Sequence, residues 1–390
     1  MKNKLRLQKG SDLQLNFQLC RMYTTAFLSQ IEGLKKMKVK LSEENGDKVQ
    51  QKNTALIDSF GRIAKKLRIS LTDRCNMRCM YCMPLGDVQW FKKEDILTYD
   101  EIIRLVSIVV KMGIEKIRLT GGEPLLRPRL EELINSLRRI TGIRSISMTT
   151  NGLLLAQNVK QLKDAGLDSV NVSLDSFKAD RFKAITGIDG IHKVIDGIDA
   201  ANRAGLKVKV NTVVIRGWND DEIVNFAEFA RTSGYTVRFI EFMPLDGSGI
   251  WQPNLVLSKK EMIEIITRNV KEIVPSDNYQ NNHDIYSEAE PAKIYSFVDG
   301  KGIIGFISSI TEPFCANCDR IRLTSDGRLL TCLFENPGYD LRSMLRSGKS
   351  EYDIEKYLVE NIKKKPEGIV KIINTNILKP SLNLMHTIGG

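Results

Sequence analysis

Three cysteines stand close together early in the chain, and their spacing could hold a metal centre. Cys75, Cys79 and Cys82 form a C-x3-C-x2-C pattern directly after an apolar, strand-like stretch. A disulfide between two of these thiols would leave the third unpaired. Thiolates are, however, good ligands for soft metals. Zinc would need a fourth ligand, and no His or Cys lies between Met83 and Tyr99. A [4Fe–4S] cluster accepts three protein thiolates and leaves one iron open; the alternative is a structural metal knuckle.

A second group of three cysteines lies near the other end of the chain. Cys315 and Cys318 form a C-x-x-C pair, and Cys332 follows after thirteen further residues. A C-x-x-C hairpin is typical of zinc sites, for which His283 or His386 could supply another ligand. Two groups of three in one chain favour a second iron–sulfur cluster, whose open iron would bind a different ligand from the first.

Cations on strand-like segments predict a binding site for an anion. Arg320 and Arg322 alternate directly after the second cysteine pair, so their side chains share one face of a strand. Arginine side chains match phosphate oxygens in geometry and charge. Three further cations at strand positions extend this set, namely Arg68, Arg118 and Lys209. The pattern indicates a pocket for a triphosphate; the alternative is a set of solvent-exposed strand cations.

The first cysteine group, with an aromatic residue directly before its last cysteine, resembles the signature of the radical-SAM superfamily. In that superfamily the open iron of the cluster chelates S-adenosyl-L-methionine (SAM). One βα unit later, Gly121–Pro124 resembles the superfamily's GGEP element, whose glycines let the backbone approach SAM without a Cβ in the way. The resemblance implies four contacts to SAM, from Tyr81, Gly122, Ser173 and Met243.

Within that superfamily, the chain from about Ile57 to Gly390 resembles the GTP 3',8-cyclases, which catalyse the first step of molybdenum cofactor biosynthesis. Beyond the cysteine groups, the resemblance lies in Asp58–Arg62, Met148–Gly152, Val172–Asp175, Phe239–Pro244 and the terminal Gly389 and Gly390. It implies two [4Fe–4S] clusters, with SAM at the first and the guanine of GTP at the second. It also implies GTP contacts from Arg68, Arg118, Thr149, Lys209, Arg320, Ile321 and Arg322.

The resemblance also implies a reaction. An electron from an unidentified donor enters the first cluster and cleaves SAM into methionine and a 5'-deoxyadenosyl radical. This radical takes hydrogen from C3' of GTP. The C3' radical then attacks C8 to give (8S)-3',8-cyclo-7,8-dihydroguanosine 5'-triphosphate, which the next enzyme of the pathway receives. Gly389 and Gly390 would act inside the active site, because residues without side chains fit a confined cavity; a homodimer is a further expectation.

The elements that must position these residues follow from the apolar pattern. Six strand-like segments alternate with helix-like ones, which predicts an α/β fold, a partial (β/α)6 TIM-type barrel of parallel strands. The first helix should begin at a capping box of Thr98 and Glu101 and end near Gly113. Two more helices are expected over Gly190–Ala204 and Asp220–Thr232. The predicted strands are Leu67–Thr72, Lys116–Thr120, Ser145–Thr150, Ser169–Leu174, Val208–Val214 and Thr236–Phe242.

One face of these strands is polar, which is unusual for parallel strands covered by helices. Period-two alternation brings polar residues of all six strands to that face, and burying them without partners would be costly. The face therefore predicts a cavity for a polar, anionic ligand. Its members are Arg68, Ser70, Thr72, Lys116, Arg118, Thr120, Ser147, Thr149, Asn151, Asn171, Ser173, Asp175, Lys209, Asn211, Glu241 and Met243.

The sequence predicts three segments along the chain: an N-terminal extension over residues 1–56, the partial barrel over 57–243 and a C-terminal segment over 244–390. Two hairpins are expected in the last segment, one with strands Ile294–Val298 and Ile303–Ser308, the other with Arg320–Thr324 and Leu329–Cys332. We expect this β-rich segment to carry the second cluster, close the open side of the barrel and end in the Gly-Gly tail.

The charge distribution argues against a nucleic-acid-binding surface. The 390 residues carry a net charge of +11, but residues 1–66, with 14 Lys and Arg against 6 Asp and Glu, account for +8. The basicity lies mostly in the extension, which favours a disordered leader over a DNA-binding face. A run of about 18 apolar residues is absent, so no membrane span is expected. We expect a cytoplasmic protein; the alternative is the mitochondrial matrix, with residues 1–40 as a transit peptide.

Two alternative functions fit parts of the pattern. A radical-SAM enzyme that modifies peptides also carries auxiliary clusters, although such enzymes typically have more C-terminal cysteines and lack the Arg-x-Arg pair. A zinc-bound nucleic-acid-binding protein would use the cysteines as zinc ligands. Metal analysis separates the two metals, because iron and sulfide colour a protein brown and zinc does not.

Overall fold

The computed structural model describes residues 55–83, 86–245, 249–276, 290–335, 337–369 and 385–389. The chain from Thr54 onward groups into one compact unit. The extension predicted over residues 1–56 lies almost wholly outside the described residues. The boundary predicted after Met243 falls inside the compact unit, two residues beyond strand β6 (Thr236–Glu241).

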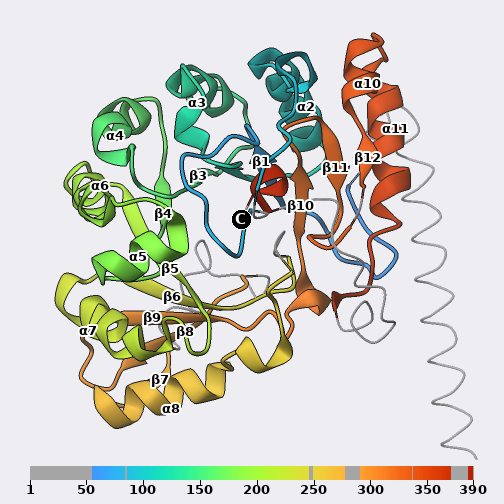
Figure 1. Cartoon of the computed structure of the whole chain (residues 1–390). Helices are drawn as coiled ribbons and strands as arrows, with labels where there is room; N and C mark the ends of the chain where they lie inside the picture. The colour runs from blue at the N-terminus through green and yellow to red at the C-terminus, as the bar shows by residue number, and fades with distance from the viewer. Residues whose placement is uncertain are drawn as a thin grey trace, which may run out of the picture. The chain divides into compact units, whose positions relative to one another are not determined.

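A single sheet of twelve strands organises the described residues, in the order β12-β11-β10-β1-β2-β3-β4-β5-β6-β9-β8-β7. Its centre is the set of six parallel strands that the sequence predicts, which confirms the α/β class and the partial barrel. The sheet has two ends, β12 and β7, and does not close into a full barrel (Figure 1). The six strands are β1 (Lys66–Ser70), β2 (Lys116–Thr120), β3 (Ser145–Thr150), β4 (Ser169–Ser173), β5 (Lys207–Val214) and β6.

The C-terminal segment extends this sheet at both edges. β9 (Ile303–Ile307) pairs parallel with β6, and β10 (Arg320–Leu323) pairs parallel with β1. β8 (Lys293–Phe297) runs antiparallel to β9, and β11 (Arg328–Leu330) antiparallel to β10, so both predicted hairpins are confirmed. The outermost strands are β7 (Ile273–Pro275) and β12 (Tyr339–Asp340). The segment that was predicted to close the open side thus adds strands to each edge, and β12 and β7 do not pair with each other.

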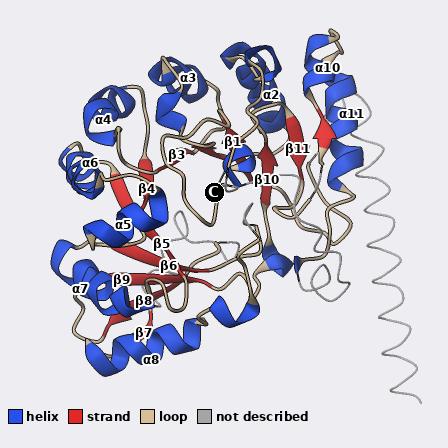
Figure 2. Cartoon of the chain, in the orientation of Figure 1, coloured by secondary structure: helices blue, strands red, loops and turns tan. Residues whose placement is uncertain are grey.

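Helices surround the strands on the outside (Figure 2). α2 (Tyr99–Lys111) begins at the predicted capping box, in which Thr98 and Glu101 each accept a backbone N–H of the other. The short helix α13 (Met385–Ile388), red in Figure 1, lies amid the strands. The other helices are α3 (Leu130–Arg138), α4 (Leu155–Asp164), α5 (Ala179–Thr186), α6 (Ile191–Arg203), α7 (Ile223–Ser233), α8 (Lys259–Asn269), α10 (Arg342–Arg346) and α11 (Glu351–Ile362).

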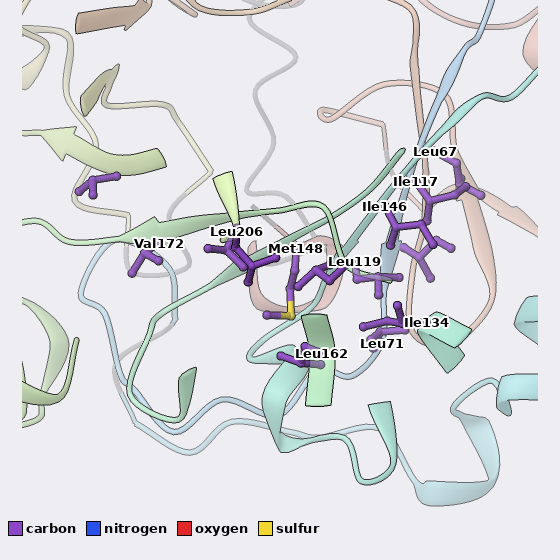
Figure 3. Packing of buried hydrophobic residues seen from close by; sticks show 14 of the residues in the cluster. Leu67, Leu71, Ile117, Leu119, Ile134, Ile146, Met148, Leu162, Val172 and Leu206 are labelled. Carbon is purple, nitrogen blue, oxygen red and sulfur yellow. The ribbon is translucent and has the colours of Figure 1, made fainter. Parts of the chain in front are cut away.

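The hydrophobic core lies between the sheet and these outer helices (Figure 3). Leu67, Ile117 and Ile146 come from three neighbouring strands and are almost fully buried. Ile134 of α3 and Leu162 of α4 belong to the same cluster. One face of each central strand is therefore committed to the core, and the alternate residues must face the inside of the curved sheet.

The parallel register aligns those inward residues from strand to strand. Arg68 of β1 stands beside Arg322 of β10 on one side and Arg118 of β2 on the other. Further along the sheet, Asn211 of β5 stands beside Arg238 of β6. The fold thus brings arginines that are far apart in the sequence into one row across adjacent strands.

Candidate active site

Both cysteine groups line a single cavity of about 300 Å³ inside the curved sheet. The first group comes from the loop after β1, and the second from the loop before β10 and the segment after β11. Because β1 and β10 are neighbours in the sheet, the fold brings the two groups together across more than 230 residues of sequence. The cysteines of this cavity are Cys75, Cys79, Cys82, Cys315, Cys318 and Cys332.

The GGEP element holds the first cysteine loop by backbone contacts. The Gly122 N–H donates to the carbonyl of Thr72 at 2.7 Å, and the Glu123 N–H donates to the carbonyl of Arg74 at 2.7 Å. A Cβ at Gly122 would collide with the carbonyl of Arg74, and Gly121 has a φ of +147°. Glycine is therefore required at both positions by the cysteine loop itself, besides any approach to SAM.

The Glu123 side chain fastens the loop to the end of β3. Its fully buried carboxylate accepts hydrogen bonds from Thr150 Oγ1 at 2.7 Å and from the Asn151 N–H at 2.8 Å. The Asn151 side chain in turn donates to Asn76 Oδ1 at 2.7 Å, inside the cysteine loop. Burial raises the pKa of Glu123 to about 7 despite these bonds. The sequence analysis did not include Glu123 among the site residues, although its place in the GGEP motif was a usable signal.

The three thiols of the first group all have raised pKa values, and burial is the largest cause for each of them. Burial, and then the charges of Cys82 and Asp175, raise the pKa of Cys79 well above its usual value. Burial and the Cys75 charge raise the pKa of Cys82 to about 12. The positive charge of the iron ions in a cluster would offset the repulsion between the neighbouring thiolates. The three cysteines therefore fit a [4Fe–4S] cluster. Among the described residues, no group of three or more His, Cys, Asp or Glu side chains lies close enough together to hold a single metal ion.

The four residues predicted to contact SAM all line the cavity: Tyr81, Gly122, Ser173 and Met243. The Tyr81 hydroxyl donates to Asp175 Oδ2 at 2.5 Å, and the Val213 N–H donates to Asp175 Oδ1 at 2.8 Å. Burial raises the pKa of Asp175 to about 6. Asp175 therefore fixes the Tyr81 ring against the wall of the cavity, next to the first cysteine group.

The thiols of the second group differ in their electrostatic surroundings. Burial alone would raise the pKa of Cys318, but the charges of Arg320 and Lys365 outweigh it and lower the pKa to about 7. Burial, followed by the charges of Cys318 and Cys315, raises the pKa of Cys332 to about 11. The Arg320 side chain also contacts the sulfur of Cys318 at 3.5 Å. A thiolate is thus favoured at Cys318, as a metal ligand requires.

Five arginines line the same cavity and repel one another. Burial, and then the charge of Arg322, lower the pKa of Arg68 well below its usual value. Burial, followed by the charge of Arg320, lowers the pKa of Arg322 to about 10. Such a concentration of buried positive charge is stabilised by an anion of several charges, such as a triphosphate. The five are Arg68, Arg118, Arg238, Arg320 and Arg322.

Five of the seven residues predicted to contact GTP line the cavity, and Lys209 and Ile321 do not. Thr149 lines the cavity. Lys209 shares the inward face of β5 with Asn211 but is not part of the cavity lining; burial, and then the charge of Arg238, lower its pKa to about 7. The Ile321 side chain lies in the hydrophobic core, because it alternates with two arginines that face inward, so the predicted GTP contact from this residue would come from its backbone.

The structure corrects the polar face predicted for β6. Glu241 was assigned to that face, but it is fully buried on the other side of the strand. Its carboxylate accepts the N–H groups of Ile310 and Thr311, both at 2.9 Å. The inward residues of β6 are Arg238 and Ile240, and the sequence analysis missed this arginine. Counting alternation from the strand start would have found it.

The described part of the C-terminal tail reaches the cavity. Met385 lines it, and Arg322 Nη1 donates to the carbonyl of Gly389 at 2.5 Å. Gly389 has a φ of +73°, and a Cβ there would collide with Thr120 Cγ2. Gly390 lies outside the described residues. The conformation and the lack of space together require glycine at position 389.

Among the described residues, no helix is long and apolar enough to cross a lipid bilayer.

Comparison with known proteins places the chain among enzymes with these features. Residues 69–230 match the model of the Radical SAM superfamily, and residues 235–370 match Molybdenum Cofactor Synthesis C. The GTP 3',8-cyclase of Thermodesulfovibrio yellowstonii is 45% identical over 85% of this chain and 99% of its own. The mitochondrial GTP 3',8-cyclase of Arabidopsis thaliana is 40% identical over 86% of this chain and 83% of its own.

A solved structure shares the fold at low sequence identity. Streptococcus suis SuiB bound to precursor peptide SuiA has a TM-score of 0.54, with 15% identity over 81% of this chain and 74% of that one. At this level of identity the likeness bears on the fold alone.

Proposed function

The chain belongs to the GTP 3',8-cyclase family of radical-SAM enzymes, and from this membership we propose how its cavity performs the reaction. The enzyme uses a [4Fe–4S] cluster and SAM to convert GTP into the 3',8-cyclised nucleotide, the first step of molybdenum cofactor biosynthesis. The membership rules out the zinc-bound nucleic-acid-binding alternative. What remains to be assigned is which residues hold each group.

Our assignment rests on one observation: both cysteine groups and five arginines line one cavity. The first cysteine group holds the radical-SAM cluster, with SAM against Tyr81, Gly122, Ser173 and Met243. Cys315, Cys318 and Cys332 would hold a second [4Fe–4S] cluster, which would supply a binding site for the guanine of GTP. The triphosphate lies along the row of Arg322, Arg68 and Arg118 that the parallel register creates. A triphosphate there would neutralise the positive charge of the arginines.

When bound, the first cluster and SAM supply the radical that removes hydrogen from C3' of GTP. The residues of the chain bind and orient. The arginines would bind the triphosphate, Glu123 holds the first cysteine loop, and Arg322 holds the Gly389 carbonyl beside Thr120. Each of these contacts limits the motion of the two reactants, and positioning of this kind supplies a large part of enzymatic rate enhancement.

The partners and location follow from the same proposal. An electron-donor protein must reduce the first cluster, the next enzyme of the pathway takes the product, and two chains associate as a homodimer. We propose a cytoplasmic location, with the mitochondrial matrix as the alternative. Fractionation of cells that express the tagged chain, with or without residues 1–40, distinguishes the two.

Product analysis tests the proposal. Reconstituted enzyme is incubated without oxygen with SAM, a reductant and each nucleoside triphosphate in turn, and products are identified by mass spectrometry. We expect cyclised product from GTP alone. We also expect about eight irons per chain, because each [4Fe–4S] cluster contributes four. Tight zinc at Cys315, Cys318 and Cys332 after anaerobic isolation would contradict the second cluster.

A further inference from the structure

The turn over Asp58–Arg62 precedes the sheet and does not line the cavity, yet it is highly organised. Ile57 and Ile63 pair across it as an antiparallel bridge. The buried Asp58 carboxylate accepts the N–H of Phe60 at 2.8 Å and that of Arg62 at 3.0 Å. It also accepts a hydrogen bond from Arg62 Nε at 2.6 Å. In this ion pair the Asp58 side chain is 0% exposed and the Arg62 side chain 7% exposed. The turn therefore holds one buried guanidinium in a fixed orientation.

That guanidinium joins the second cysteine group to a distant part of the chain. Arg62 Nη1 donates to the carbonyl of Cys315 and to that of Glu367, both at 2.8 Å. Arg62 Nη2 donates to the carbonyl of Pro366 at 2.7 Å. The Cys315 backbone is thus tied to the turn before β1 and to the segment after α11 through a single side chain.

A second buried cation holds the other cysteine of the C-x-x-C pair. Lys365 is 5% exposed, and its Nζ donates to the carbonyl of Cys318 at 2.8 Å and to that of Arg320 at 3.0 Å. Three residues later, the backbone of Gly368 packs directly on Cys315: a Cβ at Gly368 would lie 2.6 Å from Cys315 Cβ. Arg62, Lys365 and Gly368 therefore pack against the cysteine pair, and none of the three lines the cavity.

We propose that Arg62 and Lys365 are positioning residues for the second iron–sulfur cluster. By holding the carbonyls of Cys315 and Cys318, they fix the backbone from which two of its thiolates project. This inference rests on the second cluster of the proposed function. Neither cation donates a hydrogen bond to a thiol in the contacts described; both hold the backbone, and their charges also favour the reduced, more negative cluster.

The test compares variants of the full-length, reconstituted enzyme. Arg62→Gln and Lys365→Met remove the charges. Arg62→Lys keeps the charge but loses the planar set of guanidinium N–H donors. Arg104→Gln is the matched control, because Arg104 also donates to two backbone carbonyls, those of Leu345 and Lys349, away from the cavity. The measurements are iron loss to a chelator, site-resolved alkylation of the cysteines and the midpoint potential of each cluster.

We expect Arg62→Gln and Lys365→Met to release the iron of the second cluster at least about tenfold faster, since charge-assisted hydrogen bonds are lost. Alkylation should then appear at Cys315, Cys318 and Cys332, and the midpoint potential of the second cluster should become more negative. Arg62→Lys should fall between these variants and the wild type. SAM cleavage and the potential of the first cluster should stay unchanged in all of them, as in Arg104→Gln.

Gly368→Ala tests the same packing without changing any charge. The added methyl group must displace Cys315, so the second cluster should again lose iron faster while its potential changes less than in Arg62→Gln. Unchanged iron release and potential in both Arg62→Gln and Lys365→Met would overturn the inference. Equal damage to both clusters would also overturn it, because the residues would then serve the fold in general. A wild-type enzyme with only four irons would instead contradict the proposed function, on which the inference depends.

Discussion

Substitution of Gly389 by alanine tests whether the tail works inside the cavity. With a φ of +73°, Gly389 has a left-handed backbone conformation, which costs other residues roughly 1–2 kcal/mol. The new Cβ would also collide with Thr120 Cγ2 and lie only 2.9 Å from Thr120 Oγ1. Overpacking of this kind typically costs about 1–3 kcal/mol. The docked tail should thus be destabilised by roughly 2–5 kcal/mol, which lowers the docked population by a factor of about 30 or more.

The assay measures the two products of the reaction separately. Reconstituted Gly389→Ala enzyme receives SAM, reductant and GTP without oxygen, and 5'-deoxyadenosine and the cyclised nucleotide are quantified by mass spectrometry. SAM cleavage should survive at least in part, because the first cysteine group is untouched. The yield of cyclised nucleotide per 5'-deoxyadenosine should fall sharply.

Two further variants separate the causes of this loss. Gly234→Ala is the control for backbone strain alone, because Gly234 has a φ of +76° and a Cβ there would meet nothing within 4 Å. Adding Thr120→Ser to Gly389→Ala removes the Cγ2 atom of the collision and should restore part of the coupling. If the Gly389→Ala enzyme formed the cyclised product at the wild-type rate, the reasoning would be refuted, and the tail would be an ordinary frayed end.

Three other outcomes follow from the site. Replacing all three cysteines of the first group by alanine should leave roughly half of the iron and abolish SAM cleavage; an unchanged iron content would contradict the assignment. Arg320→Ala should weaken GTP binding about tenfold or more at constant iron content, since a charge-assisted hydrogen bond is worth roughly 1.5–3 kcal/mol. Arg322→Ala should affect cyclisation further because it also releases the Gly389 carbonyl, and unchanged GTP affinity in both variants would argue against the phosphate site. Lys209, whose pKa burial and Arg238 lower to about 7, should take up a proton when the triphosphate binds, because the anion favours the charged amine. GTP affinity should then fall as the pH rises above 7, and calorimetry at pH 8 in buffers of different ionisation enthalpy should detect proton uptake that Lys209→Met removes.

The sequence was sufficient for the features that depend on short-range spacing. The two cysteine groups, the GGEP element and the six central strands are all local patterns, and the structure contains them with strand ends shifted by at most two residues. β1, for example, ends at Ser70 and not at Thr72, because the Thr72 carbonyl turns to accept the N–H of Gly122. Local alternation also placed Arg68 and Arg118 correctly on the inward face.

Features that depend on distant pairing could not be predicted in this way. The parallel pairing of β10 with β1 joins segments about 250 residues apart, and no local pattern encodes it. Arg62 was part of a recognised motif, but its role depends on carbonyls at Cys315, Pro366 and Glu367. The error at Glu241 had a different origin: the alternation was counted from the wrong residue of β6, which also hid Arg238.

If one cavity holds the 5' carbon of SAM against C3' of GTP, as we propose, hydrogen must pass directly between these two carbons. GTP carrying deuterium at C3' is incubated without oxygen with reconstituted enzyme, SAM and reductant, and 5'-deoxyadenosine is examined by mass spectrometry. The account predicts that the 5'-deoxyadenosine formed together with the cyclised nucleotide contains one deuterium. Cyclised nucleotide accompanied only by unlabelled 5'-deoxyadenosine would contradict it.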